Sequence, residues 1–137
     1  MEEYRMESID RLREQANRLE EPSAELKALE QRLSAESERF LASVAGSVGG
    51  RPLQFTMGPL VFEIRKSANG QICEYRIQES DEELNELIST RGFDAGTAAG
   101  IFILSHREDI LQSCSEALED HRHMLQENID HIRSLLP

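Results

Sequence analysis

Residues 62–77 read FEIRKSANGQICEYRI, and this stretch decides the fold class of the chain. At its centre, Asn69-Gly70 is a dipeptide preferred in the two-residue loop of a type I′ turn, where both residues need a positive φ. Apolar and polar residues alternate on either side, as in strands that bury one face. The stretch therefore predicts a β-hairpin with Asn69 and Gly70 as its loop.

Pairing outward from that loop sets the register of the predicted hairpin. Arg65 falls opposite Glu74 and Glu63 opposite Arg76, so two pairs of opposite charge share one face. The other face pairs Ile64 with Tyr75, Phe62 with Ile77, and Lys66 with Cys73. Alternation and cross-strand pairing agree on this register.

A third strand is predicted before the hairpin. Residues 53–57 alternate apolar and polar side chains, and Gly58-Pro59 then marks a turn. A lone hairpin is marginally stable in water, whereas three strands with one apolar face can be stable. We therefore expect a three-stranded antiparallel meander over residues 53–78.

The glycine-rich run at 46–52 ends the preceding helix and lacks the lysine of a phosphate-binding loop.

The N-terminal segment, residues 3–45, carries a seven-residue apolar repeat. Its members are Leu12, Leu19, Leu26, Leu33 and Phe40. A row with this period lies along one side of a helix, like the d positions of a coiled coil. The matching a positions are apolar at the ends and polar in the middle, so the seam is loose. Pro22 interrupts the segment without changing the leucine spacing, which favours a kinked helix over a reversal of the chain.

A capping box is predicted to open the second helical segment, residues 81–136. The side chain of Ser80 accepts a hydrogen bond from the amide of Glu83, whose carboxylate reaches back. Asp94 can cap the next helix. Residues 95–104 favour a helix because their small side chains allow close packing, while the apolar run at the end leaves a buried strand as the alternative.

The long helix that follows has a wide apolar face. One row recurs every seven residues and consists of Leu104, Leu111, Leu118, Leu125 and Ile132. An adjacent row consists of Ile103, Ile110, Ala117 and Met124. Two neighbouring rows are enough to contact more than one partner helix. His121 and Asn128 also lie on this seam, where polar residues can fix the register of an interface.

The same helix presents carboxylates and imidazoles on its polar side. Asp120, His123, Glu127 and His131 recur at helical spacing, with Glu116 before them. Such groups are ligands of zinc, iron and manganese. Bundle di-metal sites use Glu-x-x-His on two helices, but this chain offers one Asp-x-x-His and no histidine in its N-terminal helix. A solvated charged face is therefore expected, with no metal or cofactor, and a metal-binding helical bundle is kept as an alternative.

Composition narrows the classes of function. The 137-residue chain has a formal net charge of −11, with 30% charged and 5% aromatic residues. DNA and anionic membranes attract basic proteins, so direct binding to nucleic acid or membrane is not expected. No signal peptide is recognised, and Cys73 and Cys114 form no CxxC motif. These features predict a cytoplasmic protein with reduced cysteines.

These features predict a single mainly helical α+β domain over residues 1–137. Its elements are a long N-terminal helix, a three-stranded antiparallel meander, a short helix and a long C-terminal helix. The long helices are expected to pack antiparallel, within or between subunits, with the sheet at one end. No catalytic motif stands out. The candidate pair of a cysteine nucleophile and a histidine base, Cys114 and His121, is separated by about 10 Å of helical rise, which is too far for direct contact.

We therefore expect a non-enzymatic interaction or assembly protein, either an adaptor or a small acidic chaperone. It would act through its helical seams, as a homodimer or with another protein. The expected interface residues are Leu12, Leu19, Leu26, Leu33, Phe40, Leu111, Leu118 and Leu125. An acidic decoy that occupies a basic nucleic-acid-binding site is the alternative suggested by the net charge.

Overall fold

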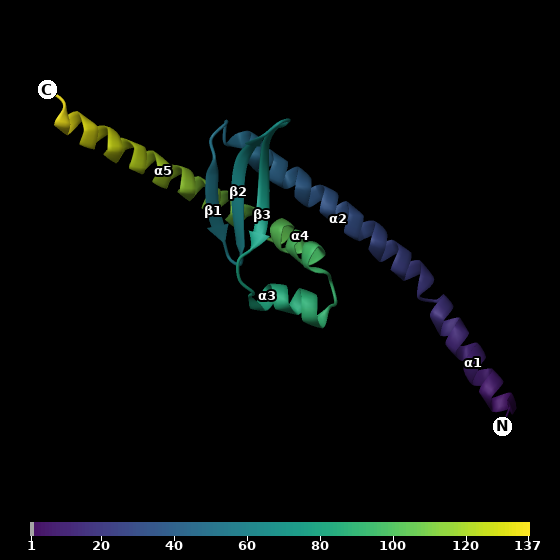
Figure 1. The fold of residues 1–137 in the computed structure, drawn as a ribbon. Helices are drawn as coiled ribbons and strands as arrows, with labels where there is room; N and C mark the ends of the chain where they lie inside the picture. Colours follow the sequence, from purple (N-terminus) through teal and green to yellow (C-terminus); the bar gives the residue numbers. More distant parts are fainter. Residues whose placement is uncertain (1) are drawn as a thin grey trace.

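Figure 1 shows the computed structural model, which describes residues 2–137 and, among these, the side chains from Arg5 onward. The elements are α1 (Glu2–Asn17), α2 (Glu20–Ser47), β1 (Leu53–Met57), β2 (Leu60–Ser67), β3 (Gly70–Ile77), α3 (Glu82–Asn85), the π-helical turn η1 (Glu86–Thr90), α4 (Ala95–Ser105) and α5 (Arg107–Leu135). This order confirms the predicted fold class, a mainly helical α+β chain with a central meander.

The N-terminal helix is interrupted but keeps its direction. α1 ends at Asn17, Arg18 and Leu19 form a turn, and α2 begins at Glu20. Pro22 lies in the first turn of α2, where a backbone amide has no partner within the helix. The two helices continue onward with a modest bend (Figure 1), so the prediction of a kink rather than a reversal is confirmed.

The three strands form one antiparallel sheet in the order β1-β2-β3, as predicted. The turn between β1 and β2 depends on Gly58, which has a φ of 56°. A Cβ added to Gly58 would lie 3.1 Å from the Cζ atom of Phe102. Glycine thus satisfies both the left-handed backbone and the close approach of the α4 side chain.

The predicted register of the β2–β3 hairpin is wrong by two residues. Ser67 pairs with Gly70, so Ala68 and Asn69 form the loop. Gly70 takes a φ of 116° while Asn69 does not have a positive φ, so the loop is not a type I′ turn. The Ser67 hydroxyl donates to the Gly70 carbonyl at 2.9 Å and accepts from the Asn69 amide at 3.3 Å, which stabilises this turn.

A shift of two residues keeps every side chain on its predicted face but changes the cross-strand pairs. Glu63 lies opposite Glu74 instead of Arg76, and Arg65 reaches Glu74 diagonally, with 2.8 Å between Nη2 and Oε1. Arg65 and Glu74, predicted to lie directly opposite each other, therefore form a diagonal ion pair. On the other face the pairs are Leu60 with Ile77, Phe62 with Tyr75, Ile64 with Cys73 and Lys66 with Gln71.

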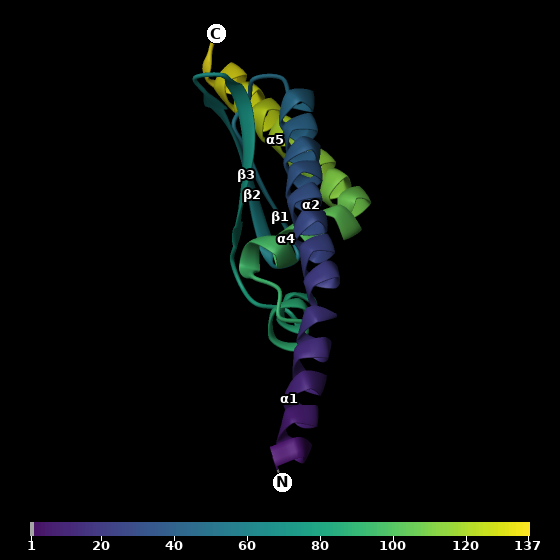
Figure 2. The same cartoon turned by 90° about the vertical axis from the view of Figure 1, so that its right-hand side faces the viewer.

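The core lies between one face of the sheet and the helices α2, α4 and α5 (Figure 2). Its largest fully buried apolar side chains are Phe62, Leu60, Ile64, Leu84, Ile103 and Ile110, with Pro59 beside them. The Phe62 ring stacks on Phe55, with 5.1 Å between centroids. Where α4 crosses α2, a Cβ on Gly100 would lie 3.5 Å from the Leu33 side chain, which shows how closely the small residues of α4 approach.

Side-chain caps start the two helices that follow the sheet. Asp81, not the predicted Ser80, caps α3, and its Oδ1 accepts the Leu84 amide at 2.9 Å. A carboxylate at this position also interacts favourably with the helix dipole, which favours Asp81 over its neighbour. Asp94 caps α4 as predicted, accepting the Thr97 amide at 2.7 Å. Because α4 covers Ala95–Ser105, the helical interpretation of this stretch is confirmed.

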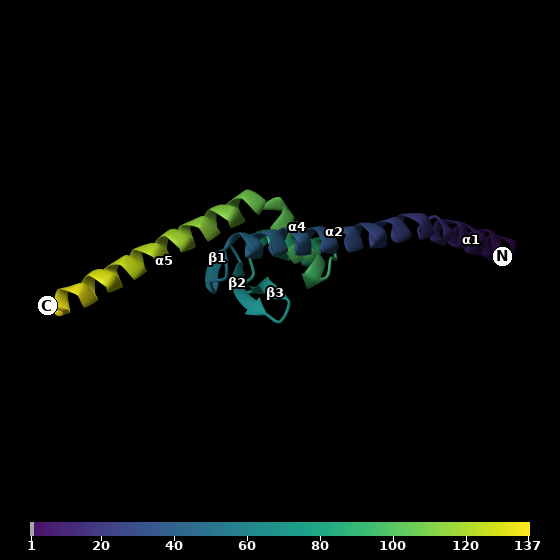
Figure 3. The ribbon, with the colours of Figure 1, turned by 90° about the horizontal axis from the view of Figure 1, so that it is seen from above.

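The long helices leave the core in opposite directions (Figures 1 and 3). Within the described chain, α2 packs on β3 and α4, and α5 packs on β1, but α2 and α5 do not pack along each other. The expectation of antiparallel helices with the sheet at one end is therefore wrong for a single chain. α4 takes the place beside α2, and the chain then turns at His106 so that α5 leaves on the other side. Among the described residues, no helix is long and apolar enough to cross a membrane.

Candidate interaction surfaces

The N-terminal end of the molecule consists of α1 and the first turns of α2, which project from the core. Every residue from 5 to 29 is exposed, and we call this range the N-arm. Leu12 and Leu19 are each 64% exposed and Leu26 is 48% exposed. The exposed large apolar side chains of the N-arm are Met6, Ile9, Leu12, Leu19, Leu26 and Leu29.

The apolar row of the N-arm enters the core at its inner end. Leu33 is half-buried and contributes to the contact between α2 and α4, and Phe40 packs against the core cluster. Further along α2, Leu41 and Val44 are buried. Two of the five predicted seam residues, Leu33 and Phe40, therefore already have partners within the chain, and three do not.

The C-terminal end of the molecule repeats this arrangement. α5 packs on β1 through its first turns, where Ile110 and Cys114 are buried and Ala117 is partly buried. Beyond them the helix projects into solvent, and we call residues 118–135 the C-arm. Its exposed large apolar side chains are Leu118, Met124, Leu125, Ile129, Ile132 and Leu135. Leu111, although beside the buried row, is also 44% exposed.

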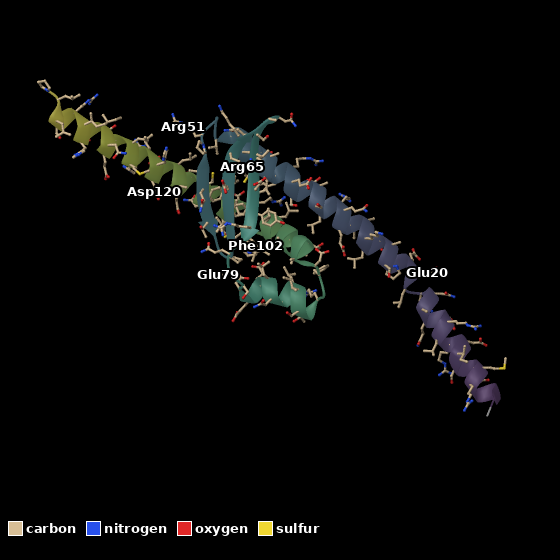
Figure 4. The ribbon with its side chains drawn as sticks, in the orientation of Figure 1. Glu20, Arg51, Arg65, Glu79, Phe102 and Asp120 are labelled. Atoms are coloured by element: carbon tan, nitrogen blue, oxygen red, sulfur yellow. The ribbon has the colours of Figure 1, made fainter. Side chains whose placement is uncertain are left out.

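The two apolar rows do not meet within one chain. Figure 4 places Glu20 on the N-arm and Asp120 on the C-arm, on opposite sides of the core. The predicted contacts of Leu12, Leu19 and Leu26 with Leu118 and Leu125 are therefore absent from the described single chain. Sequence periodicity identified the surfaces correctly as apolar rows, but it could not place them in space.

Ion pairs between residues three or four positions apart lie on the polar sides of both arms. Arg18 Nη2 lies 2.7 Å from Glu14 Oε1, and Arg122 Nη2 lies 3.0 Å from Glu119 Oε2. Such exposed pairs three or four residues apart contribute about 0.3–0.5 kcal/mol each to a helix. They support the helices without covering the apolar rows.

The predicted metal-ligand candidates remain on the exposed side of the C-arm. Asp120, His123, Glu127 and His131 are all exposed, and the nearest charged contact of His123 is Glu119, 3.9 Å away. Among residues 5–137, whose side chains the structure describes, no group of three or more His, Cys, Asp or Glu side chains gathers in a geometry that could hold a metal ion.

The two cysteines are free thiols with raised pKa values. Burial, together with the charges of Cys114 and Glu74, raises the pKa of Cys73 to about 12. Burial also raises the pKa of Cys114, which lies in the core. A reactive cysteine has a lowered pKa, so neither thiol has the character of a nucleophile at neutral pH.

One polar cluster joins residues that are distant in the sequence. His106, at the corner between α4 and α5, has its Nε2 2.7 Å from Glu83 Oε2 and its Nδ1 3.5 Å from Asp109 Oδ2. Its ring also packs on Phe102, with 4.3 Å between centroids. Glu83 lies on another element, so sequence spacing gives no signal for this contact. The cluster links α3 to the corner between α4 and α5.

Comparisons with known proteins add no relative. The chain matches no protein-family model, no curated protein and no solved structure at a significant level.

Proposed function

We propose that this chain is a non-enzymatic assembly protein, an adaptor or small acidic chaperone, that binds helical segments along its two arms. The observation that carries the proposal is a row of large apolar side chains left exposed on each arm, outside a core that is already closed. Contiguous exposed apolar surface is typical of interaction sites.

Energetics favours a bound state for the arms. A single helix without tertiary contacts is marginal in water, because most helical stability in proteins comes from packing of the apolar face. Complete burial of one leucine side chain contributes about 1.5–3 kcal/mol. Covering even part of the six large apolar side chains on each arm would therefore offset the entropy lost on association.

The charge of the N-arm suits helix binding better than it suits the acidic-decoy alternative. The N-arm has five basic and six acidic side chains, a net charge of −1, and these signs are interleaved. A decoy needs carboxylates gathered against a basic site, whereas interleaved charges suit a helix pair with ionic contacts along its edges.

Light scattering after size exclusion tests the proposal. The wild-type chain should elute in an assembly heavier than the 15.6 kDa of one chain, alone or with a partner that co-purifies. Leu19→Glu and Leu118→Asp should each dissociate the assembly, because each places an unpaired charge at a buried contact. Asn17→Glu and Gln126→Glu add the same charge beside the apolar rows and should preserve the mass. If the wild-type chain has the mass of one chain and the arm variants change nothing, the proposal is wrong.

A further inference from the structure

We propose that the occupant of each arm is the opposite arm of a second copy: the N-arm of one chain pairs antiparallel with the C-arm of its twin. This inference rests on the proposed function and names the partner. It follows from the direction of the arms, their length and the match of their side chains at one register.

The direction of the arms allows one symmetry operation to cover both. Along the chain, the N-arm runs toward the core and the C-arm runs away from it, on the opposite side (Figure 3). A two-fold axis perpendicular to the long dimension reverses the second copy. Its C-arm then runs antiparallel beside the first N-arm, and its N-arm beside the first C-arm. The interface is closed and isologous, the commonest arrangement of soluble oligomers.

The heptad rows of the two arms can be matched at several offsets, and the flanking charges favour one of them. A shift of one heptad from that offset in either direction sets Arg122 opposite Arg13 or Lys27. When Leu19 is set opposite Leu125 of the second copy, the same offset sets Leu12 opposite Ile132 and Leu26 opposite Leu118. These three layers contain only large apolar residues, all of them exposed in one chain. Packing of such layers between facing helices is the basis of coiled-coil association.

Two of the three remaining seam layers match in polarity at this offset. Ile9 meets Leu135, which closes the outer end with an apolar pair. Ser23 then meets His121, so the polar interruption in the N-arm faces the polar interruption in the C-arm. In the third layer Ala16 meets Asn128, a small apolar residue opposite a polar one. The loose middle of the N-terminal seam thus has a counterpart in the C-terminal helix.

The flanking positions agree as well. Glu20 falls beside Arg122, and no two like charges face each other across the flanks at this offset. Apolar flanks meet as Met6 with Leu136, Pro22 with Met124, and Leu29 with Ala117. Seam and flanks together involve about 20 residues of each chain, at the lower end of the range for stable interfaces. Parallel pairing of two N-arms would instead set Glu30 against Glu30 and leave the C-arms uncovered.

Cysteine pairing between two tagged copies tests this arrangement. Leu19→Cys and Leu125→Cys chains are co-expressed, oxidised mildly, and the linked peptides are identified by mass spectrometry, with wild type as the background for Cys73 and Cys114. The mixture should form a 19–125 link, and each variant alone should give about ten-fold less linked dimer, because a disulfide needs Cβ atoms within about 4.5 Å. As a second test that needs no cysteine, Glu20→Arg and Arg122→Glu should each weaken the dimer about two- to five-fold, and together restore it.

The outcomes separate this inference from the proposed function. Links between two copies of Leu19→Cys, or an assembly of the wild-type chain with a different protein, would overturn the cross-arm pairing while the arms still act as binding surfaces. A wild-type chain that keeps the mass of one chain, with no partner that depends on Leu19 or Leu118, would overturn both.

Discussion

The core and the arms of this molecule use similar apolar residues to opposite effect. In the core, the sheet, α4 and the first turns of α5 enclose Phe62 and Ile103 completely. In the arms, Leu12 and Leu125 belong to equally regular rows but stay 64% and 40% exposed. The difference is the presence of a second layer, since a helix buries its stripe only when another element covers it. The core therefore supplies its own covering layer, whereas the apolar rows of the arms have none within the described chain.

The largest effect expected from a single substitution lies in the core. Phe62→Ala should lower the free energy of unfolding by about 3–5 kcal/mol, because it removes a fully buried ring and leaves a cavity beside Phe55. Leu12→Ala, measured in dilute chain, should change it by less than about 0.5 kcal/mol. Urea denaturation followed by circular dichroism measures both values. If both variants lost the same free energy of unfolding, the distinction between a self-covered core and uncovered arms would be wrong.

Gly58→Ala should have the next largest effect. The substitution puts a Cβ on a residue with φ of 56° and 3.1 Å from the Phe102 ring, so it strains the backbone and displaces α4. We expect a loss of about 1–3 kcal/mol in unfolding free energy. Gly49→Ala is the matched control, because Gly49 also has a positive φ but no neighbour within 4 Å. If both variants lost the same unfolding free energy, the close approach of Phe102 to residue 58 would make no contribution to the loss.

Gly100→Ala is expected to stabilise the core. Gly100 is helical, and an added Cβ would lie at van der Waals distance, 3.5 Å, from Leu33. Replacing glycine within a helix by alanine then contributes roughly 0.5–1 kcal/mol. A higher melting temperature measures the gain. Destabilisation would mean that α2 and α4 cannot accommodate one methyl group at their crossing.

The smallest effect concerns His106, at the corner between α4 and α5. Burial lowers the pKa of His106, but the hydrogen bonds and charges of Glu83 and Asp109 outweigh it, so the folded-state pKa is raised. The stabilisation is therefore fully present below the usual histidine pKa of about 6.5 and is lost as the pH rises through the higher folded value. Since these groups are partly exposed, the contribution should be about 0.5 kcal/mol at most. His106→Gln should remove this pH dependence in urea titrations at several pH values.

Local patterns predicted the elements of this fold, and tertiary contacts decided the rest. The alternation of residues 53–57 and the leucine row from Leu12 to Phe40 were sufficient to predict a meander between two helical segments. The hairpin loop was misplaced because Ser67 stabilises a turn in which only Gly70 needs a positive φ.

Spatial placement could not be predicted from periodicity. The rows containing Leu19 and Leu125 were identified as apolar stripes, but their separation depends on α4 occupying the space beside α2. The contact of His106 with Glu83 joins residues 23 positions apart and leaves no periodic signal. These are the features that determine which surfaces remain open.

Hydrogen–deuterium exchange at several protein concentrations compares core and arm amides in one sample and would show whether the arms depend on association. We expect β2 and α4 amides to be protected at every concentration, whereas amides of residues 5–29 and 118–135 should gain protection only as the chains associate. The same protection in arms and core at a dilution where light scattering gives 15.6 kDa would contradict this expectation, because the arms would then be stable without a partner.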